Sequence, residues 1–243
     1  MTAQDLARAA WFDAYWMLLG PLLALLFCAL PLPQHGSFQQ ASPCLRYLTR
    51  GLLLVYTIHQ LEEHGWDLYG NRYSFISWMN SVMAAKSGLA ITVRQVTLVN
   101  VLTVWVGEIT ACLSAEIFGR SLPVAFHWAL ATANAVVHLS FVAATRTYNP
   151  GAGQSVIQFA LGACFFSEYF WTRGFSFPLL VLLFVLGGPV GHLGGIVLPL
   201  KLGVSDPVFA LFQLLVAVAL PALLSFLLER PAASEPKGKQ KDD

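Results

Sequence analysis

Seven apolar stretches recur along the chain of 243 residues, and short polar segments separate them. A transmembrane helix needs about 20 predominantly apolar residues, and each stretch is close to that length. They cover residues 14–33, 47–66, 92–118, 122–145, 153–172, 176–199 and 207–228. The sequence therefore predicts an all-α fold, a polytopic transmembrane helical bundle of about seven spans.

The overall composition agrees with a membrane protein and excludes other classes. Hydrophobic residues make up 56% of the chain and charged residues only 11%, whereas soluble domains carry about 25% charged residues. The formal net charge of +1 leaves no basic stripe for a nucleic-acid partner. The expected partners are the lipid bilayer and a lipophilic small molecule.

The chain divides into one domain and a tail. Residues 1–229 are predicted to form a single transmembrane domain, and residues 230–243 a disordered, charged, cytosolic tail. Lys239 and Lys241 lie near the end of this tail and resemble the dilysine retrieval signal of endoplasmic-reticulum membrane proteins. We therefore expect the endoplasmic-reticulum membrane as the location, with a plain solvated tail as the alternative.

Two segments depart from the pattern of simple spans. Residues 67–91 mix polar and apolar side chains and are too polar to cross, so they are predicted to be interfacial or re-entrant and to cap a site. Residues 187–195 are rich in glycine and contain Pro189, which should break or kink the sixth span.

The strongest chemical signal is His-Gln-Leu-Glu-Glu-His at residues 59–64, at the end of the second apolar stretch. A charged side chain at the bilayer centre costs about 3 kcal/mol and is usually functional. At about 100° per residue, His59, Glu62 and Glu63 project from one helix face. No lysine or arginine in this turn can neutralise the carboxylates, so a proton, an imidazolium or a bound metal must do so.

Polar residues on other spans should lie in the same layer. Spans alternate in direction and rise 1.5 Å per residue, which puts Asn100, Asn134, His138 and His192 near the depth of His59, with Glu108 nearer mid-membrane. Interhelical hydrogen bonding is the alternative explanation. The predicted catalytic residues are His59, Glu62, Glu63, Glu108, Asn134 and His138, and the predicted substrate-binding residues are Asn100, Trp105 and His192. The residues expected near the opposite face, in interfacial or capping roles, are Glu116, His127 and Glu168, while His64 could simply be solvated.

Three spaced motifs carry a resemblance to a known family. They are His59-Gln-Leu-Glu62-Glu63, followed by Phe75 and Trp78-Met-Asn80; Asn134-Ala-Val-Val-His138; and Tyr148-Asn-Pro150-Gly151. Over about residues 55–165 the chain resembles the HXXEE-domain family of small integral membrane proteins. The resemblance implies an enzyme that uses these polar residues, but no particular reaction or substrate.

A weaker resemblance is to the emopamil-binding sterol isomerase family. Ile58-His59, Glu63, Gly65-Trp66 and Leu68-Tyr69 look like its first acidic helix with one extra residue, His64, and Glu108-Ile-Thr110 looks like its second, with the glutamate shifted by one position. This resemblance implies that one buried acid protonates an alkene while a second group removes a proton.

Three functions remain open from the sequence. The first is an acid–base enzyme, needing no cofactor, that opens, hydrolyses, cyclises or isomerises an isoprenoid or polyketide. There Glu63 would be the general acid, partnered by Glu62 or Glu108, with His59 and His138 relaying protons and Asn134 orienting the substrate oxygen. The second is a metal-dependent intramembrane hydrolase, in which zinc, iron or manganese is bound by His59, Glu63, His138 and His192. The third is a non-enzymatic lipid-binding, transport or scaffold protein.

Overall fold

The computed structural model describes residues 11–173 and 176–229, and every regular element within these ranges is a helix. The first half contains α2 (Trp11–Ala29), α3 (Gly36–Gln39), α4 (Pro43–Gln60), η1 (Leu61–Gly65), α5 (Ser74–Ser87), α6 (Val93–Leu98), η2 (Val99–Val106) and α7 (Gly107–Phe118). The second half contains α8 (Leu122–Thr145), α9 (Ala152–Arg173), α10 (Phe177–Val185), η3 (Leu186–Gly194), α11 (Gly195–Lys201), α12 (Asp206–Leu214), η4 (Leu215–Ala219) and α13 (Leu220–Leu228). The predicted all-α fold is confirmed.

The elements labelled η are π-helical stretches that continue directly into their α-helical neighbours. Each long helix therefore combines several elements: 43–65, 93–118, 177–201 and 206–228. Together with α2, α8 and α9, these helices match all seven predicted apolar ranges. The predicted break near Pro189 is a π-helical stretch, Leu186–Gly194, in which the helix continues with wider hydrogen bonding.

Among the described residues, five helices are long and apolar enough to cross a membrane: Trp11–Ala29, Val93–Phe118, Leu122–Thr145, Phe177–Lys201 and Asp206–Leu228. The protein therefore has the character of an integral membrane protein. The helix formed by α4 and η1 and the helix α9 do not meet the same measure of length and hydropathy. The count of about seven spans is thus not confirmed.

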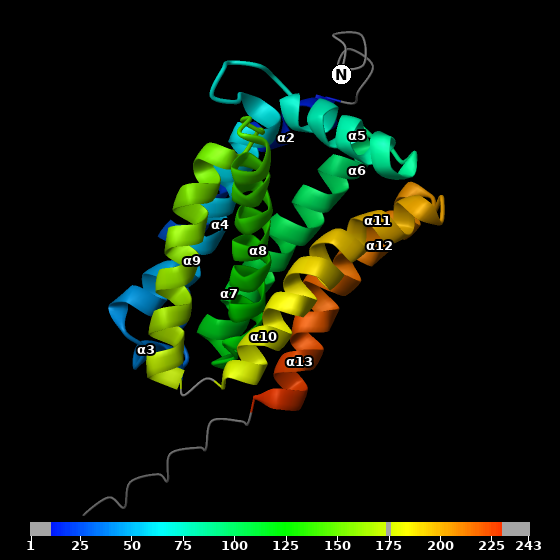
Figure 1. Ribbon diagram of the computed structural model, residues 1–243. Helices are drawn as coiled ribbons and strands as arrows, with labels where there is room; N and C mark the ends of the chain where they lie inside the picture. The colour runs from blue at the N-terminus through cyan, green and yellow to red at the C-terminus, as the bar shows by residue number, and fades with distance from the viewer. Residues whose placement is uncertain (1–10, 174–175, 230–243) are drawn as a thin grey trace, which may run out of the picture.

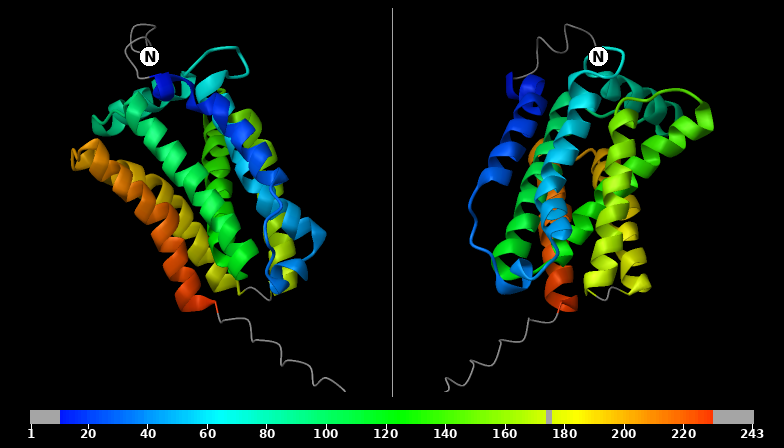
Figure 2. Two further views of the ribbon diagram at one scale, coloured as in Figure 1. Left: turned by 180° about the vertical axis from the view of Figure 1, so that it is seen from behind. Right: turned by 90° about the vertical axis from the view of Figure 1, so that its left-hand side faces the viewer.

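The long helices pack side by side, and α5 lies across one end of the bundle (Figure 1). Helix α4 packs against α2 on one side and α9 on the other, while α8 packs against α7, α9 and the helix of α10 and η3 (Figure 2). Residues 67–91 form a loop and α5 rather than a span. This agrees with the prediction that the segment does not cross.

Local sequence signals explain where two of the helices near the site begin. Ser42 accepts a hydrogen bond from Leu45 N at 3.1 Å and precedes Pro43, which suits the first turn of α4. Thr92 and Gln95 form a reciprocal capping box at the start of α6. These caps fix where α4 and α6 start.

The end of the bundle away from α5 holds the residues expected at the opposite face. Arg50 Nη2 lies 2.6 Å from Glu116 Oε2, and His127 Nε2 lies 2.9 Å from Ala217 O. Glu116 is fully buried, so Arg50 compensates its charge. Both Glu116 and His127 therefore make structural contacts, and the tail with Lys239 and Lys241 lies outside the described residues.

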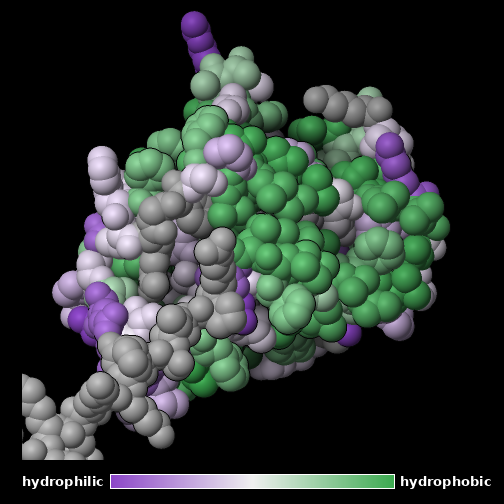
Figure 3. All heavy atoms as spheres, turned by 90° about the horizontal axis from the view of Figure 1, so that it is seen from below, coloured by the Kyte–Doolittle hydropathy of each residue, from purple (hydrophilic) through white to green (hydrophobic). Residues whose placement is uncertain are grey.

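The outer surface of α10 to α13 is apolar. Phe177, Val185, Leu211, Leu215 and Phe226 are all exposed there. Seen from below, apolar side chains gather on the side where these helices lie (Figure 3). Such a surface suits contact with lipid.

Helices α8 and α9 approach closely because glycine lies at their contact. A Cβ added at Gly162 would lie 2.1 Å from Thr132 Oγ1, whereas one added at Gly51 would meet nothing within 4 Å. Trp128 stacks on Phe165 in the same interface, with ring centroids 5.5 Å apart. Small residues that allow such approach are typical of packed membrane helices.

We predict that Gly162→Ala lowers the free energy of unfolding by about 1–3 kcal/mol, because Thr132 must move to admit the methyl group. The matched variant Gly51→Ala should be neutral or stabilising by up to about 1 kcal/mol, since alanine favours the helix and has room. Thermal unfolding of the two purified variants in detergent checks this. Equal effects at both positions would contradict the close packing of α8 on α9.

Candidate functional site

Three of the π-helical stretches deliver polar residues to one pocket. Glu63 and His64 lie on η1, Asn100 on η2 and His192 on η3, while Asn134 lies on the regular helix α8. π-Helical turns are uncommon and are frequent at functional sites. The layer of polar residues expected from span direction and depth is therefore present at the α5 end of the bundle.

Glu63 is the centre of this layer. Its Oε1 lies 3.0 Å from His138 Nε2 and 3.3 Å from His59 Nε2, and its Oε2 lies 3.4 Å from His64 Nε2. Glu63 is 5% exposed and the three histidines are at most 2% exposed. A carboxylate buried to this extent needs compensating partners, and the imidazoles are the polar side chains that surround it.

Asn149 determines which nitrogen of His138 carries a proton. Asn149 Nδ2 donates to the backbone oxygen of His138 at 3.0 Å, so Asn149 Oδ1 is the atom that faces His138 Nδ1. An amide oxygen only accepts, and Nδ1 must therefore be the protonated nitrogen. His138 Nε2 then presents either a lone pair or an imidazolium proton to Glu63.

His59 Nε2 also faces Glu63 Oε1. The amide nitrogen of Asn134 lies 3.0 Å from this atom, and because an amide nitrogen only donates, Nε2 accepts. The ring of His59 packs edge-on against Tyr56 and His138, with centroids 5.7 Å and 5.0 Å away. Electron pairs of His59, Glu63 and His138 thus converge, and one ligand-type atom from each lies within 4.8 Å of the others.

Gly151 allows the loop after α8 to close over this cluster. A Cβ at Gly151 would lie 2.8 Å from Glu63 Cγ, 2.9 Å from His59 Cε1 and 3.0 Å from His138 Cε1. Its φ of +94° is also one that other residues rarely adopt. Only glycine satisfies both requirements, so the loop backbone lies directly against the three side chains.

Glu62 has different neighbours from Glu63. It accepts hydrogen bonds from Tyr148 Oη at 2.8 Å, Gly153 N at 3.0 Å and Gln154 N at 2.6 Å. The two backbone donors belong to the first turn of α9, where N–H groups lack partners and favour a negative charge. Burial, followed by the contact with Glu62, raises the pKa of Tyr148, so its hydroxyl keeps the proton that it donates. Glu62 therefore ties η1 to α9, whereas the sequence predicted it beside Glu63.

The pocket beside Glu63 is polar on one side and apolar on the other. Its polar wall contains Glu63, His64, Asn100, Asn134 and His192. Its apolar wall contains Phe75, Met79, Ile91, Val96, Val99 and Ile196, and Tyr56 also lines it. The cavity of about 40 Å³ has room for a few water molecules. A lipid-like molecule would need α5 or the C-terminal helices to move.

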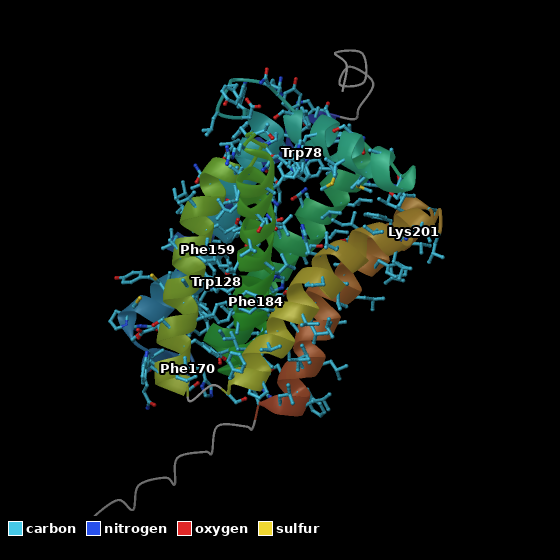
Figure 4. The ribbon with its side chains drawn as sticks, viewed as in Figure 1. Trp78, Trp128, Phe159, Phe170, Phe184 and Lys201 are labelled. Atoms are coloured by element: carbon cyan, nitrogen blue, oxygen red, sulfur yellow. The ribbon has the colours of Figure 1, made fainter. Side chains whose placement is uncertain are left out.

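Helix α5 covers the cluster with aromatic rings. Trp78 stacks on the ring of His138 with centroids 6.2 Å apart, and Phe75 packs edge-on against His64 at 5.2 Å. Trp78 belongs to α5 and lies at the end of the bundle that this helix covers (Figure 4). The segment predicted to cap the site thus lies over it.

The other predicted site residues divide into two groups. Trp105 Nε1 donates to Gln60 Oε1 at 3.0 Å, and Gln60 Nε2 donates to Asn100 Oδ1 at 2.9 Å, so Trp105 supports Asn100 from behind the pocket wall. Glu108 is fully buried, and neither carboxylate oxygen has a hydrogen-bond partner within the described ranges. Glu108 is not among the residues that line the pocket. The structure therefore does not bring Glu108 to Glu63.

Comparison with known families identifies one matching segment. The family model described as "Protein of unknown function with HXXEE motif" matches residues 51–166. This segment is an HXXEE domain. Searches of curated proteins and of solved structures give no match. The resemblance to the emopamil-binding sterol isomerase family stays a prediction.

The three motifs of the HXXEE domain come together in the structure and supply the residues around Glu63. His59, Glu63 and His138 come from the first two motifs, and Tyr148 and Gly151 from the third. The sequence analysis missed Asn149 and left open that His64 is simply solvated, whereas His64 is fully buried. The sequence signal for Asn149 was its position inside the third motif. The signal for His64 was that it is the fourth ionisable residue within one helical turn or so.

We predict that Gly151→Ala disrupts the cluster and lowers the free energy of unfolding by about 2–4 kcal/mol, since it adds both backbone strain and overlap. Gly70→Ala is the matched control, because Gly70 has a φ of +80° but open space around it. That variant should suffer only the backbone strain, and its free energy of unfolding should fall by about 1 kcal/mol. Thermal unfolding of both variants checks the difference, and equal losses would mean that the loop does not press on the cluster.

Proposed function

We propose that this protein is a membrane-embedded enzyme that converts a lipophilic small molecule at Glu63. The observation that carries the proposal is a buried carboxylate, in contact with three imidazoles, at the edge of a pocket whose other wall is apolar. Ionisable groups inside membrane proteins are costly and mark functional sites. The apolar wall would hold the hydrocarbon part of the substrate, and the polar wall its reacting group.

The reaction that best suits this arrangement is acid–base chemistry. A proton held between Glu63 and His138 can be delivered to an alkene or an epoxide oxygen in the pocket, and the resulting carboxylate or imidazole can then accept one. Proton transfer of this kind leads to epoxide opening, hydrolysis, cyclisation or isomerisation of an isoprenoid or polyketide. Asn134 and Asn100, on the pocket wall, would hold the substrate oxygen.

A second chemistry uses the same atoms. A divalent metal between His59, Glu63 and His138 would polarise the substrate or activate water, as in metal-dependent hydrolases. The observation that favours it is the convergence of the three ligand-type atoms within 4.8 Å. A non-enzymatic lipid carrier is the remaining possibility, and it predicts no turnover at all.

The two glutamates of the motif should behave differently. Glu63→Gln removes the reacting carboxylate, so we expect turnover to fall by about 100-fold or more. Glu62→Gln instead faces an amide nitrogen toward backbone donors, so it should lower the free energy of unfolding by about 1–3 kcal/mol and reduce turnover of the folded protein far less. The assay incubates purified protein in lipid vesicles with a panel of terpenoid epoxides and alkenes, and mass spectrometry detects products.

Isotopically labelled water makes this assay more specific. Deuterium on a product carbon identifies alkene protonation, and heavy oxygen in a product identifies hydrolysis. His127→Ala, distant from the pocket, should retain turnover. Full turnover in Glu63→Gln would refute the assignment of the site, and equal losses in the Glu62 and Glu63 variants would refute the division of roles.

We also propose that α4 with η1 and α9 cross the membrane, which restores the count of seven. Helix α4 packs between α2 and α9, and its polar residues Arg50 and His59 pair with Glu116 and Glu63. Helix α9 packs against α4 and α8, and its exposed side chains Val156, Ile157 and Phe159 are apolar and suit lipid. Polar groups that are satisfied inside a bundle do not prevent a helix from spanning. The location in the endoplasmic reticulum rests on the tail alone, with Lys239 and Lys241 facing the cytosol.

Seven spans predict that the start of α2 and the end of α13 lie on opposite sides of the membrane. Epitope tags at the two termini, tested by protease protection in sealed microsomes, check this, and the C-terminal tag should be on the cytosolic side. Two tags with the same accessibility would mean an even number of spans.

A further inference from the structure

The geometry points to a divalent transition-metal site formed by His59 Nε2, Glu63 Oε1 and His138 Nε2. This inference rests on the second chemistry of the proposed function, in which a metal ion rather than a proton lies between the converging electron pairs. Its test nevertheless measures metal rather than turnover.

The two distances from Glu63 Oε1 to the histidine nitrogens are those of ligands around one ion. Nitrogen and carboxylate ligands bind zinc or a similar ion at about 2.1 Å, so two ligands at angles of about 90–110° lie about 3.0–3.4 Å apart. Glu63 Oε1 lies 3.0 Å from His138 Nε2 and 3.3 Å from His59 Nε2. Two imidazoles and one carboxylate favour zinc, iron or manganese over magnesium or calcium, which prefer oxygen ligands.

The protonation of the two rings also suits a metal. Asn149 Oδ1 accepts from His138 Nδ1, which leaves Nε2 as the ligand atom. Histidine ligands usually donate their other nitrogen to an oxygen in this way, which fixes the ring and raises its basicity. His59 Nε2 already accepts from Asn134, so it too presents a lone pair. An ion would take that lone pair and free the Asn134 amide for a substrate oxygen.

The pocket provides the open coordination position. Catalytic metal sites have three protein ligands and leave a further position for water or substrate. Glu63 and Asn134 line the cavity of about 40 Å³, which can hold such a water. His192 lines the same cavity from the C-terminal helices. It is not one of the three residues whose ligand atoms converge.

The test is the metal content of the full-length protein, purified in detergent without added chelator and analysed by mass spectrometry. We expect about one equivalent of zinc, iron or manganese per chain, and at least a tenfold loss in both His59→Ala and His138→Ala. The matched control is His127→Ala, a fully buried histidine whose Nε2 contacts Ala217 O and not Glu63. It should retain the metal.

A second measurement covers loss of metal during purification. Chelator-treated protein is titrated with cobalt(II), and saturable visible d–d absorption with one equivalent supports the site. Elution as a single species in size-exclusion chromatography verifies that each variant is folded. Wild-type protein with neither bound metal nor saturable cobalt binding overturns the inference.

The outcomes separate this inference from the proposed function. If the protein contains no metal and the Glu63→Gln variant loses turnover, the proposed enzyme with acid–base chemistry is supported and the metal site is refuted. Stoichiometric metal, together with unchanged turnover in Glu63→Gln, supports the site and refutes the proposed function.

Discussion

The burial of the Glu63 carboxylate is the constraint around which the α5 end of the bundle is arranged. A buried charge is tolerated only with partners that stabilise it, and removing one partner from such a set is strongly destabilising. His59 comes from the same helix, His64 from the same turn and His138 from α8. These contacts join α4, η1 and α8, so the same interactions form the site and hold this end of the bundle together.

Three residues of the loop between α8 and α9 complete that arrangement, and each makes a different kind of contact. Tyr148 reaches Glu62, Asn149 fixes His138, and Gly151 lies against the cluster without a side chain. Glu62 in turn accepts from the first turn of α9. The three motifs of the HXXEE domain are thus one interacting unit, and neighbouring glutamates in one motif have separate neighbours.

The C-terminal helices lie outside the matched segment and still form part of the pocket. His192 and Ile196 come from η3 and α11 and face the domain across the cavity. The opposite surface of these helices is apolar. An element that contacts both the pocket and the surrounding lipid is well placed to control how a lipophilic molecule enters, since the cavity is smaller than such a molecule.

The amino-acid sequence was sufficient to predict the long helices and most of the residues that meet at the site. Apolar runs of the right length located every long helix, because hydropathy and helix length are local properties. Alternating direction then placed His59, Glu63, Asn134, His138 and His192 in one layer. Which of these residues are in contact depends on how the helices pack: Glu62 faces α9, Glu108 lies outside the pocket lining, and His64 is buried against Glu63. The reason is physical, since π-helical turns change the rotation between residues, and a loop backbone can approach a cluster only where packing and a glycine leave room for it.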